Sequence, residues 1–415
     1  MKFLVLLLAF GVVVGSDFAF GEEIIAAESP KPNNVFSEPF DLMGARFQIG
    51  GEDFSSPFVE AHNIEQSRYE SVYFAQYHGL PPGMRGPMPP LTVPKLADAN
   101  QHPLWFDGTQ GEYNLSRLVT GLFDRGQFAD LEKLFDDWQN PTERLADGRW
   151  KLAIFEKALR AEFERSTDWD RLYAHIQEWQ LAFPKSRPAT LTEAIYWRTY
   201  AWDARGTGYS NSVTQDGWQF FRQRLEKAQA VLLESKTYTS TSPLWARMFL
   251  ATAGDLNWPK QKLLDTFREL AKSQSNFDQL YLTVVGTLVP KWGGNWQLVD
   301  NFVREAAGMT QEFDGYSMYA RLYWQVYLWE GSQTDLFRGT RAMWPDMKKG
   351  FEDQMRAYPH SAYNLNTFAA AACMAGDKEE FQSLRFRIGK FVIPDAWPSN
   401  YSPDLCDHKF AAKPL

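Results

Sequence analysis

Residues 125–138, RGQFADLEKLFDDW, contain the pattern that decides the fold. A glycine turn opens the segment, and an apolar stripe follows it at Leu131, Leu134, Phe135 and Trp138. Spacings of i, i+3, i+4 and i+7 place side chains on one face of an α-helix. The segment therefore predicts a tight turn that leads into an amphipathic helix.

The same arrangement returns about every forty residues. Turn residues separated by 38 to 48 positions are Gly126, Asp168, Gly206, Gly254, Gly293, Gly331 and Gly376. Each gap is long enough for two helices, and apolar stripes of helical spacing recur at 263–271 and 299–306. A fixed period of about 20 to 50 residues is typical of stacked helical hairpins. We therefore expect an all-α, tetratricopeptide-like solenoid of irregular hairpins of about forty residues.

Helix starts are predicted at three places. Thr190 and Glu193 fit a capping box, in which each side chain bonds a free backbone N–H. Residues 140–141 and 242–243 place a capping side chain before a proline, which is tolerated in the first helical turn.

The N-terminus has the features of an export signal. Lys2 precedes twelve apolar residues, 3–14, and residues 19–21 give the small-x-small pattern that signal peptidase cleaves. The apolar run is shorter than the ~20 residues that span a membrane, and no later run is long enough. We expect an exported protein, periplasmic or extracellular, that begins near Glu22 and has no transmembrane segment in its mature chain.

Four segments are expected along the chain. They are a signal peptide (1–21), an irregular leader with a proline-rich segment (22–112), an α-helical repeat domain (113–397) and a C-terminal tail (398–415). Six prolines between positions 81 and 94 exclude a helix there, because proline lacks the N–H and clashes with the preceding turn. This strip suits an extended arm laid over a surface, a ligand for an aromatic groove or a plain linker.

Two cysteines, Cys373 and Cys406, are too few for a disulfide scaffold. In an oxidising compartment they would staple the tail to the last repeat. A buried thiol and an unrelated tail thiol are the alternative, and the sequence leaves both open.

Composition narrows the class of partner. The net charge of −8, with no block of basic residues, makes nucleic acid a poor candidate. The chain is 44% hydrophobic and 15% aromatic, enough for a large core. Because a single core stops growing beyond ~250–300 residues, this length leaves either several domains or an elongated stack, and the turn period favours the stack.

Polar and aromatic side chains occur together at several turns. The candidate binding residues are Trp202, Arg205, Lys291, Trp292, Tyr319, Arg321, His360 and Asn364. Trp202 and Arg205 share a helix face and suit a cation–π contact. Stacked repeats line a concave groove with equivalent positions, so these residues would bind a protein, a peptide or a glycan there. Packing between repeats, with polar tips bonded to the backbone, is the alternative.

No catalytic or metal signature accompanies the repeats. Residues 315–319 approach the G-x-S-x-G elbow but have Tyr319 where the second glycine is required. The six histidines are scattered, and the neighbouring Cys, Asp and His at 406–408 are not expected to converge on one ion. We therefore expect no catalytic residues, no metal and no cofactor.

Acidic residues keep one enzymatic alternative open. A glycosidase needs two carboxyl groups roughly 5–10 Å apart across a cleft, and carboxylates occur at 136–137, Asp168, Asp170 and 379–380. The leading hypothesis is an exported, non-catalytic interaction scaffold. The alternative is an enzyme acting on polysaccharide or peptidoglycan, built on a helical superhelix or toroid.

Four short strings carry a resemblance to a known family. They are Trp202–Gly208, Pro290–Gly294, Tyr319–Arg321 and Tyr358–Ser361, the last leading to Asn364 and Asn366. Together they resemble the uncharacterised bacterial family called domain of unknown function 4034, over roughly residues 110–400. The resemblance implies a helical-repeat fold and no established activity.

Overall fold

The computed structural model describes residues 48–49, 52–53, 109–206, 208, 210–330, 334–389, 391–398 and 400–411. The expected signal peptide, the proline-rich segment and the turn at Gly331 lie outside these residues. Backbone contacts divide the chain into two units, residues 9–81 and residues 1–8 with 82–415. In the first unit, β1 (Gln48–Ile49) pairs antiparallel with β2 (Glu52–Asp53).

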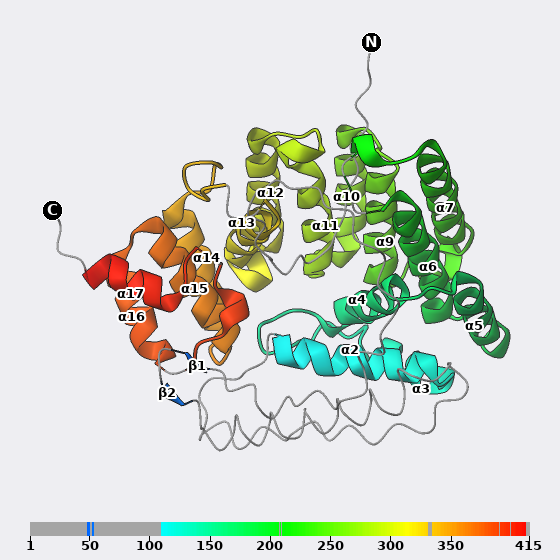
Figure 1. Cartoon of the computed structure of the whole chain (residues 1–415), viewed down its shortest axis with the longest axis horizontal. Coiled ribbons are helices and arrows are strands. Elements are labelled where there is room, and N and C mark those ends of the chain that lie inside the picture. The colour runs from blue at the N-terminus through cyan, green and yellow to red at the C-terminus, as the bar shows by residue number, and fades with distance from the viewer. Residues whose placement is uncertain are drawn as a thin grey trace, which may run out of the picture. The chain divides into compact units, whose positions relative to one another are not determined.

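Residues 109–411 of the second unit form a succession of helices joined by short connections (Figure 1). The α-helices are α2 (Thr109–Asp124), α3 (Phe128–Asp137), α4 (Lys151–Glu164), α5 (Trp169–Ala182), α6 (Arg187–Arg205), α7 (Gln215–Glu234), α8 (Lys236–Thr239), α9 (Pro243–Asp255), α10 (Lys260–Gln274), α11 (Asp278–Leu288), α12 (Trp296–Asp314), α13 (Ser317–Glu330), α14 (Trp344–Ala357), α15 (Ala362–Ala375), α16 (Lys378–Ile388) and α17 (Pro403–Ala411). Three 3₁₀ turns are η3 (Ser210–Ser212), η4 (Pro290–Trp292) and η5 (Pro394–Ala396).

These helices pack in two rows, as expected for a solenoid. In the inner row, α2, α4, α6, α9, α11 and α13 contact one another in that order. Beside this row, α10 packs against two helices, and α7, α12 and α14 each pack against three. Nine of the eleven residues of α11 are buried, since neighbours cover it on all sides. Outer helices bury one stripe, which in α12 contains Val299, Phe302 and Val303. The all-α prediction is confirmed over this region.

Of the three predicted helix starts, one is confirmed and two are wrong. Ser242 caps α9 in front of Pro243, as predicted. The predicted capping box is wrong, because α6 begins earlier: Ser186 caps it, and Thr190 lies inside the helix. No helix follows Asn140, whose side chain instead accepts a hydrogen bond from the Thr142 backbone N–H at 3.1 Å.

Most of the predicted turns lie at helix ends. Gly126, Gly206, Gly293 and Gly376 have positive φ, and Asp168 caps α5. Gly254 is an exception because it lies within α9, and the chain turns three residues later at Asn257, with φ of 56°.

A connection between α3 and α4, residues 138–150, reaches across to helices far along the chain. We call it the closing loop. Its Arg144 Nη2 donates to the Asn276 carbonyl at 3.0 Å, and its Asp147 carbonyl accepts from Arg321 Nη2 at 3.3 Å and Asn364 Nδ2 at 3.2 Å. These contacts join residues 132 to 217 positions apart. The first hairpin of the row is thereby tied to α11, α13 and α15.

The C-terminal end is held by a disulfide between Cys373 of α15 and Cys406 of α17, with Cα atoms 5.9 Å apart. Lys409 Nζ also donates to the Cys373 carbonyl at 2.6 Å, and Phe381 contacts Phe410 with ring centroids 5.2 Å apart. The region expected to be a tail thus contains a helix that packs on the last repeat.

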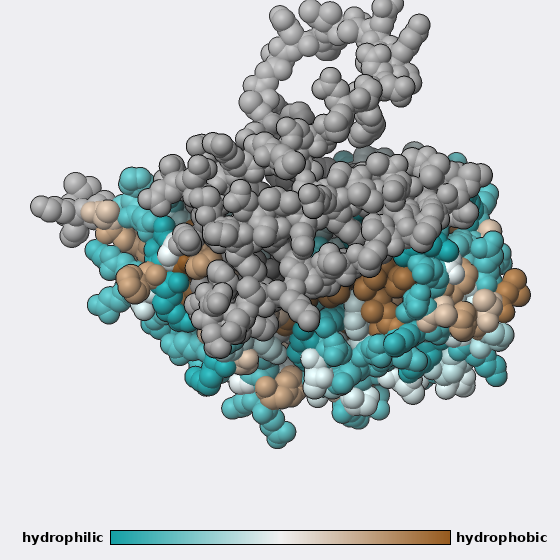
Figure 2. Space-filling model, turned by 90° about the horizontal axis from the view of Figure 1, so that it is seen from below, coloured by the Kyte–Doolittle hydropathy of each residue, from teal (hydrophilic) through white to brown (hydrophobic). Residues whose placement is uncertain are grey.

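Figure 2 shows one face of the molecule, on which the described residues are mostly hydrophilic and hydrophobic side chains form separate groups. Among the helices of the described ranges, none combines the length and apolar character needed to cross a membrane. The same ranges contain no group of three or more His, Cys, Asp or Glu side chains arranged to hold a metal ion.

Candidate functional site

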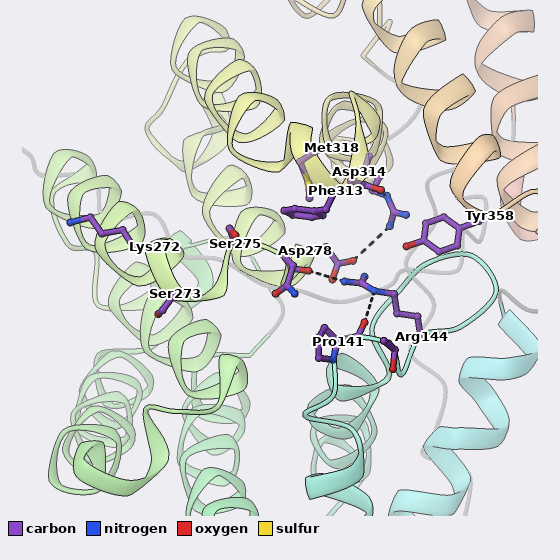
Figure 3. Close-up of a pocket in the computed structure, with 13 residues that line it drawn as sticks. Pro141, Arg144, Lys272, Ser273, Ser275, Asp278, Phe313, Asp314, Met318 and Tyr358 are labelled. Carbon is purple, nitrogen blue, oxygen red and sulfur yellow. Dashed lines mark hydrogen bonds and ion pairs between the residues drawn. The ribbon is translucent and has the colours of Figure 1, made fainter.

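Two adjoining cavities lie where the closing loop meets the inner row. The larger has a volume of about 410 Å³ and the smaller about 130 Å³, and both are lined by Asp278, Met318 and Arg321. Asp278, Arg144 and Tyr358 point toward a common centre, whereas Lys272 points away from it (Figure 3). The site is thus built from the closing loop, the first turn of α11, one face of α13 and the end of α14.

Asp278 is buried because of the helix that it begins. Since neighbouring helices cover α11 on all sides, even Asp278, its first residue, is only 4% exposed. Neither carboxylate oxygen has a hydrogen-bond partner among the described residues. The nearest cation is Arg321, whose Nη1 lies 3.8 Å from Oδ2 and so beyond hydrogen-bond range. Burial raises the pKa of Asp278, and the attraction of Arg321 and Arg144 only partly offsets it.

Arg321 stands next to two carboxylates. Besides Asp278, Asp314 Oδ2 lies 3.9 Å from its Nε, again too far for a hydrogen bond. Burial acts to lower the pKa of Arg321, but Asp314 and Asp278 outweigh it, so the guanidinium stays charged. The ring of Tyr358 lies 5.7 Å from its Cζ, within cation–π range. Its Nε has no hydrogen-bond partner in the described part of the chain.

The closing loop approaches this pair through a glycine. Gly148 has φ of 88°, a conformation in which a Cβ is strained. A Cβ added there would also overlap the Tyr358 ring and the Arg321 guanidinium. Glycine at 148 therefore allows the loop backbone to lie directly against the cavity wall.

Two more residues that line the smaller cavity contain a buried polar atom without a hydrogen-bond partner in the described chain. They are Trp324 on α13, with Nε1, and Thr367 on α15, with Oγ1. With both oxygens of Asp278 and Nε of Arg321, the residues that line this one small cavity contain five such atoms. A buried polar group left unpaired costs ~1–3 kcal/mol, so native proteins pair nearly all of them with protein, water or ligand. Their clustering indicates a site for a polar group.

Of the eight residues singled out from the sequence, the structure brings together Arg321 and Asn364. Both donate to the Asp147 carbonyl, and both line the smaller cavity. Tyr319 is two residues from Arg321 but is fully buried, and its hydroxyl accepts from the Met343 N–H at 3.2 Å. Tyr319 therefore belongs to the core, as the packing alternative anticipated.

Trp202 and Arg205 form a separate cluster at the end of α6. Trp202 Nε1 donates to Asp255 at 3.1 Å, and Arg205 is only 7% exposed. The Arg205 Cζ lies 5.8 Å from the ring of Trp202 and 5.5 Å from that of Trp218. The expected cation–π contact is present, but it is part of the packing at this turn.

The other three predicted residues lie outside both cavities. Lys291 donates to the Trp329 carbonyl at 2.9 Å and lies 3.4 Å from Glu330. Trp292 is half-buried in η4, and His360 is exposed just before α15.

Sequence reasoning missed Asp278, Arg144, Trp324 and Thr367. A usable signal existed for Asp278 alone: it is a carboxylate at the head of a helix whose remaining residues are almost all apolar. For Arg144 the sequence is misleading, because residues 140–141 predict a helix start there and not a loop that reaches a cavity.

The fold and the site together define a helical-repeat protein with a polar cavity on its inner row. The family model described as Domain of unknown function (DUF4034) matches residues 117–276. The predicted resemblance is confirmed for this part of the chain, whereas Asp278 and Arg321 lie beyond it. No curated protein and no solved structure matches the chain.

Proposed function

We propose that this protein is an exported, non-catalytic binding protein that holds a polar ligand in the two cavities around Arg321 and Asp278. The ligand is a small polar molecule or the polar group of a peptide or glycan. The closing loop and the inner row act as two walls, and the repeats serve as the scaffold that keeps them in place.

One observation carries this proposal. Four residues that line a single small cavity, Asp278, Arg321, Trp324 and Thr367, together contain five buried polar atoms without a hydrogen-bond partner in the described residues. A purely structural network would pair its members, because an unpaired buried group costs more than a hydrogen bond contributes. Donors and acceptors at fixed positions inside a cavity are instead typical of ligand sites.

A filled cavity tests the proposal. Pro141 is exposed, lines the larger cavity and lies beside Arg144 (Figure 3), so Pro141→Trp obstructs that cavity without removing a charge. Thermal melting of the full chain with amino acids, short peptides and amino sugars should show a ligand that stabilises the wild type but not Pro141→Trp. Thr237→Trp, on the exposed surface of α8, is the matched control and should respond like the wild type. Equal ligand responses in all three proteins would contradict the proposal.

The export part of the proposal depends on the N-terminal segment. Expressed in a bacterium with its own N-terminus, the protein should be recovered outside the cytoplasm and begin near Glu22. N-terminal sequencing checks this, and an uncleaved cytoplasmic product would contradict it.

A second candidate is an enzyme acting on polysaccharide or peptidoglycan. It is favoured by Asp278 and Asp314, two carboxylates that line one cavity. Glycosidases place such a pair on either side of the scissile bond, but here one guanidinium, that of Arg321, lies within 4 Å of both carboxylates and occupies the space between them and a substrate. We therefore expect no release of reducing ends from peptidoglycan. Release by the wild type that disappears in Asp314→Asn would establish the enzyme instead.

A further inference from the structure

We infer that the ligand of the two cavities is a zwitterionic α-amino acid, with its ammonium group at Asp278 and its carboxylate at Arg321 and Trp324. This inference rests on the proposed binding function and narrows it to one class of ligand.

The carboxylate of Asp278 is the group that requires an ammonium group in the ligand. Its two oxygens are buried acceptors without a hydrogen-bond partner in the described chain, and its closest cation is held 3.8 Å away. An amide N–H supplies one hydrogen to one oxygen. An ammonium group supplies three donors and a full charge, so it serves both oxygens and compensates the desolvation of the carboxylate.

Two side chains of α13 require a carboxylate in the ligand. Arg321 and Trp324 are three residues apart and therefore share a face of this helix, and both line the smaller cavity. Arg321 Nε and Trp324 Nε1 are donors without an acceptor among the described residues. A carboxylate provides two oxygens and the charge that a buried guanidinium binds most strongly.

Charge balance excludes ligands with only one of these groups. Five charged residues line the larger cavity, but Lys272 points away from its centre and is paired with Glu269 (Figure 3). The other four, Arg144, Arg321, Asp278 and Asp314, give the wall two charges of each sign. A cation without a carboxylate would bring a third positive charge close to the two arginines. An anion without an ammonium group would lie against the two aspartates. A ligand with one charge of each sign leaves no buried charge uncompensated.

The two volumes agree with this assignment. The smaller cavity, of about 130 Å³, has room for about four waters at ~30 Å³ each, which suits a small charged head group. The larger cavity adjoins it through Asp278, Met318 and Arg321 and is also lined by Phe313. A side chain that extends from the head group into this volume would contact Met318 and Phe313.

Calorimetric titration of the full chain tests the inference. The probes are the common L-α-amino acids, and the best of them is compared with three analogues. Its N-acetyl form lacks the ammonium charge, its amide lacks the carboxylate, and its dipeptide with glycine separates the two groups. We expect each analogue to bind at least about 10-fold more weakly than the free amino acid, since each loses a charge-assisted contact.

Variants locate the binding. Asp278→Asn should weaken the amino acid at least about 30-fold, the effect of removing one partner of a buried charge pair. Trp324→Phe keeps most of the ring but removes the Nε1 donor at the ligand's carboxylate, and should weaken binding about 10- to 100-fold. Asp137→Asn removes an exposed carboxylate on α3 and should bind like the wild type. If Asp278→Asn does not fold, as circular dichroism would show, Trp324→Phe decides the result.

The outcomes separate this inference from the proposed function. An N-acetyl or amide analogue that binds as tightly as the amino acid overturns the zwitterion and leaves the binding function standing. The same holds if only a sugar or a peptide binds and Pro141→Trp blocks that binding. If no probe binds and no ligand response is lost in Pro141→Trp, both the inference and the proposed function are overturned.

Discussion

Replacing Gly148 by alanine should loosen the closing loop, and the expected cost can be worked from two separate causes. The first is conformational, because a Cβ at φ of 88° costs ~1–2 kcal/mol in the left-handed region. The second is steric, because the Cβ would overlap the Tyr358 ring and the Arg321 guanidinium. Forcing such groups aside typically costs ~1–3 kcal/mol. Gly148→Ala should therefore reduce the free energy of unfolding by roughly 2–5 kcal/mol.

Gly376→Ala is the matched control, since Gly376 has a similar φ of 79° but open space where the Cβ would be. Only the conformational cost applies there, ~1–2 kcal/mol. Both free energies can be measured by urea denaturation followed by tryptophan fluorescence. Gly148→Ala should be the less stable by about 1–3 kcal/mol. Equal losses in the two variants would refute the contact between the closing loop, Tyr358 and Arg321.

Three further predictions concern stability. Burial raises the pKa of Asp278 above the unfolded value, so its contribution to stability is complete below pH ~3.9 and is lost as pH rises through the folded pKa. In denaturation curves at pH 7, Asp278→Asn should therefore be more stable than the wild type, by about 1.4 kcal/mol for each unit by which folding raises the pKa of Asp278. This difference in stability should shrink toward pH 4, and a difference that does not change with pH would contradict the prediction. Cys406→Ala opens a loop closed over 33 residues and should cost about 3–4 kcal/mol, and a reductant should lower the melting temperature of the wild type but not of the variant. Arg205→Ala removes a buried guanidinium that donates to the Gly206 carbonyl at 3.0 Å, so it should cost about 1.5–3 kcal/mol in a thermal melt, and a change within ~0.5 kcal/mol would mean that Arg205 is exposed in solution.

The fold could be predicted because it depends on local pattern. Turn glycines such as Gly376 and apolar stripes such as that of α3 act over a few residues, and each hairpin contacts chiefly its neighbours. Errors arose where a local signal was ambiguous. A polar residue before a proline, as at Asn140, suits a helix start and a turn equally well.

The closing loop could not be predicted in this way. It depends on hydrogen bonds such as that from Asn364 to the Asp147 carbonyl, which join residues 217 positions apart. No spacing rule connects such positions, because their proximity follows from how all the helices between them stack. Arg321 was singled out for its neighbour Tyr319, yet its partners in the structure are Asp278 and Asp314.

The most direct test of the account is a crystal structure of the full chain grown with a saturating mixture of the common L-α-amino acids. The account predicts continuous density in the smaller cavity, with an ammonium group at the Asp278 carboxylate and a carboxylate at Arg321 Nε and Trp324 Nε1. Separate, water-sized peaks alone in both cavities would contradict it.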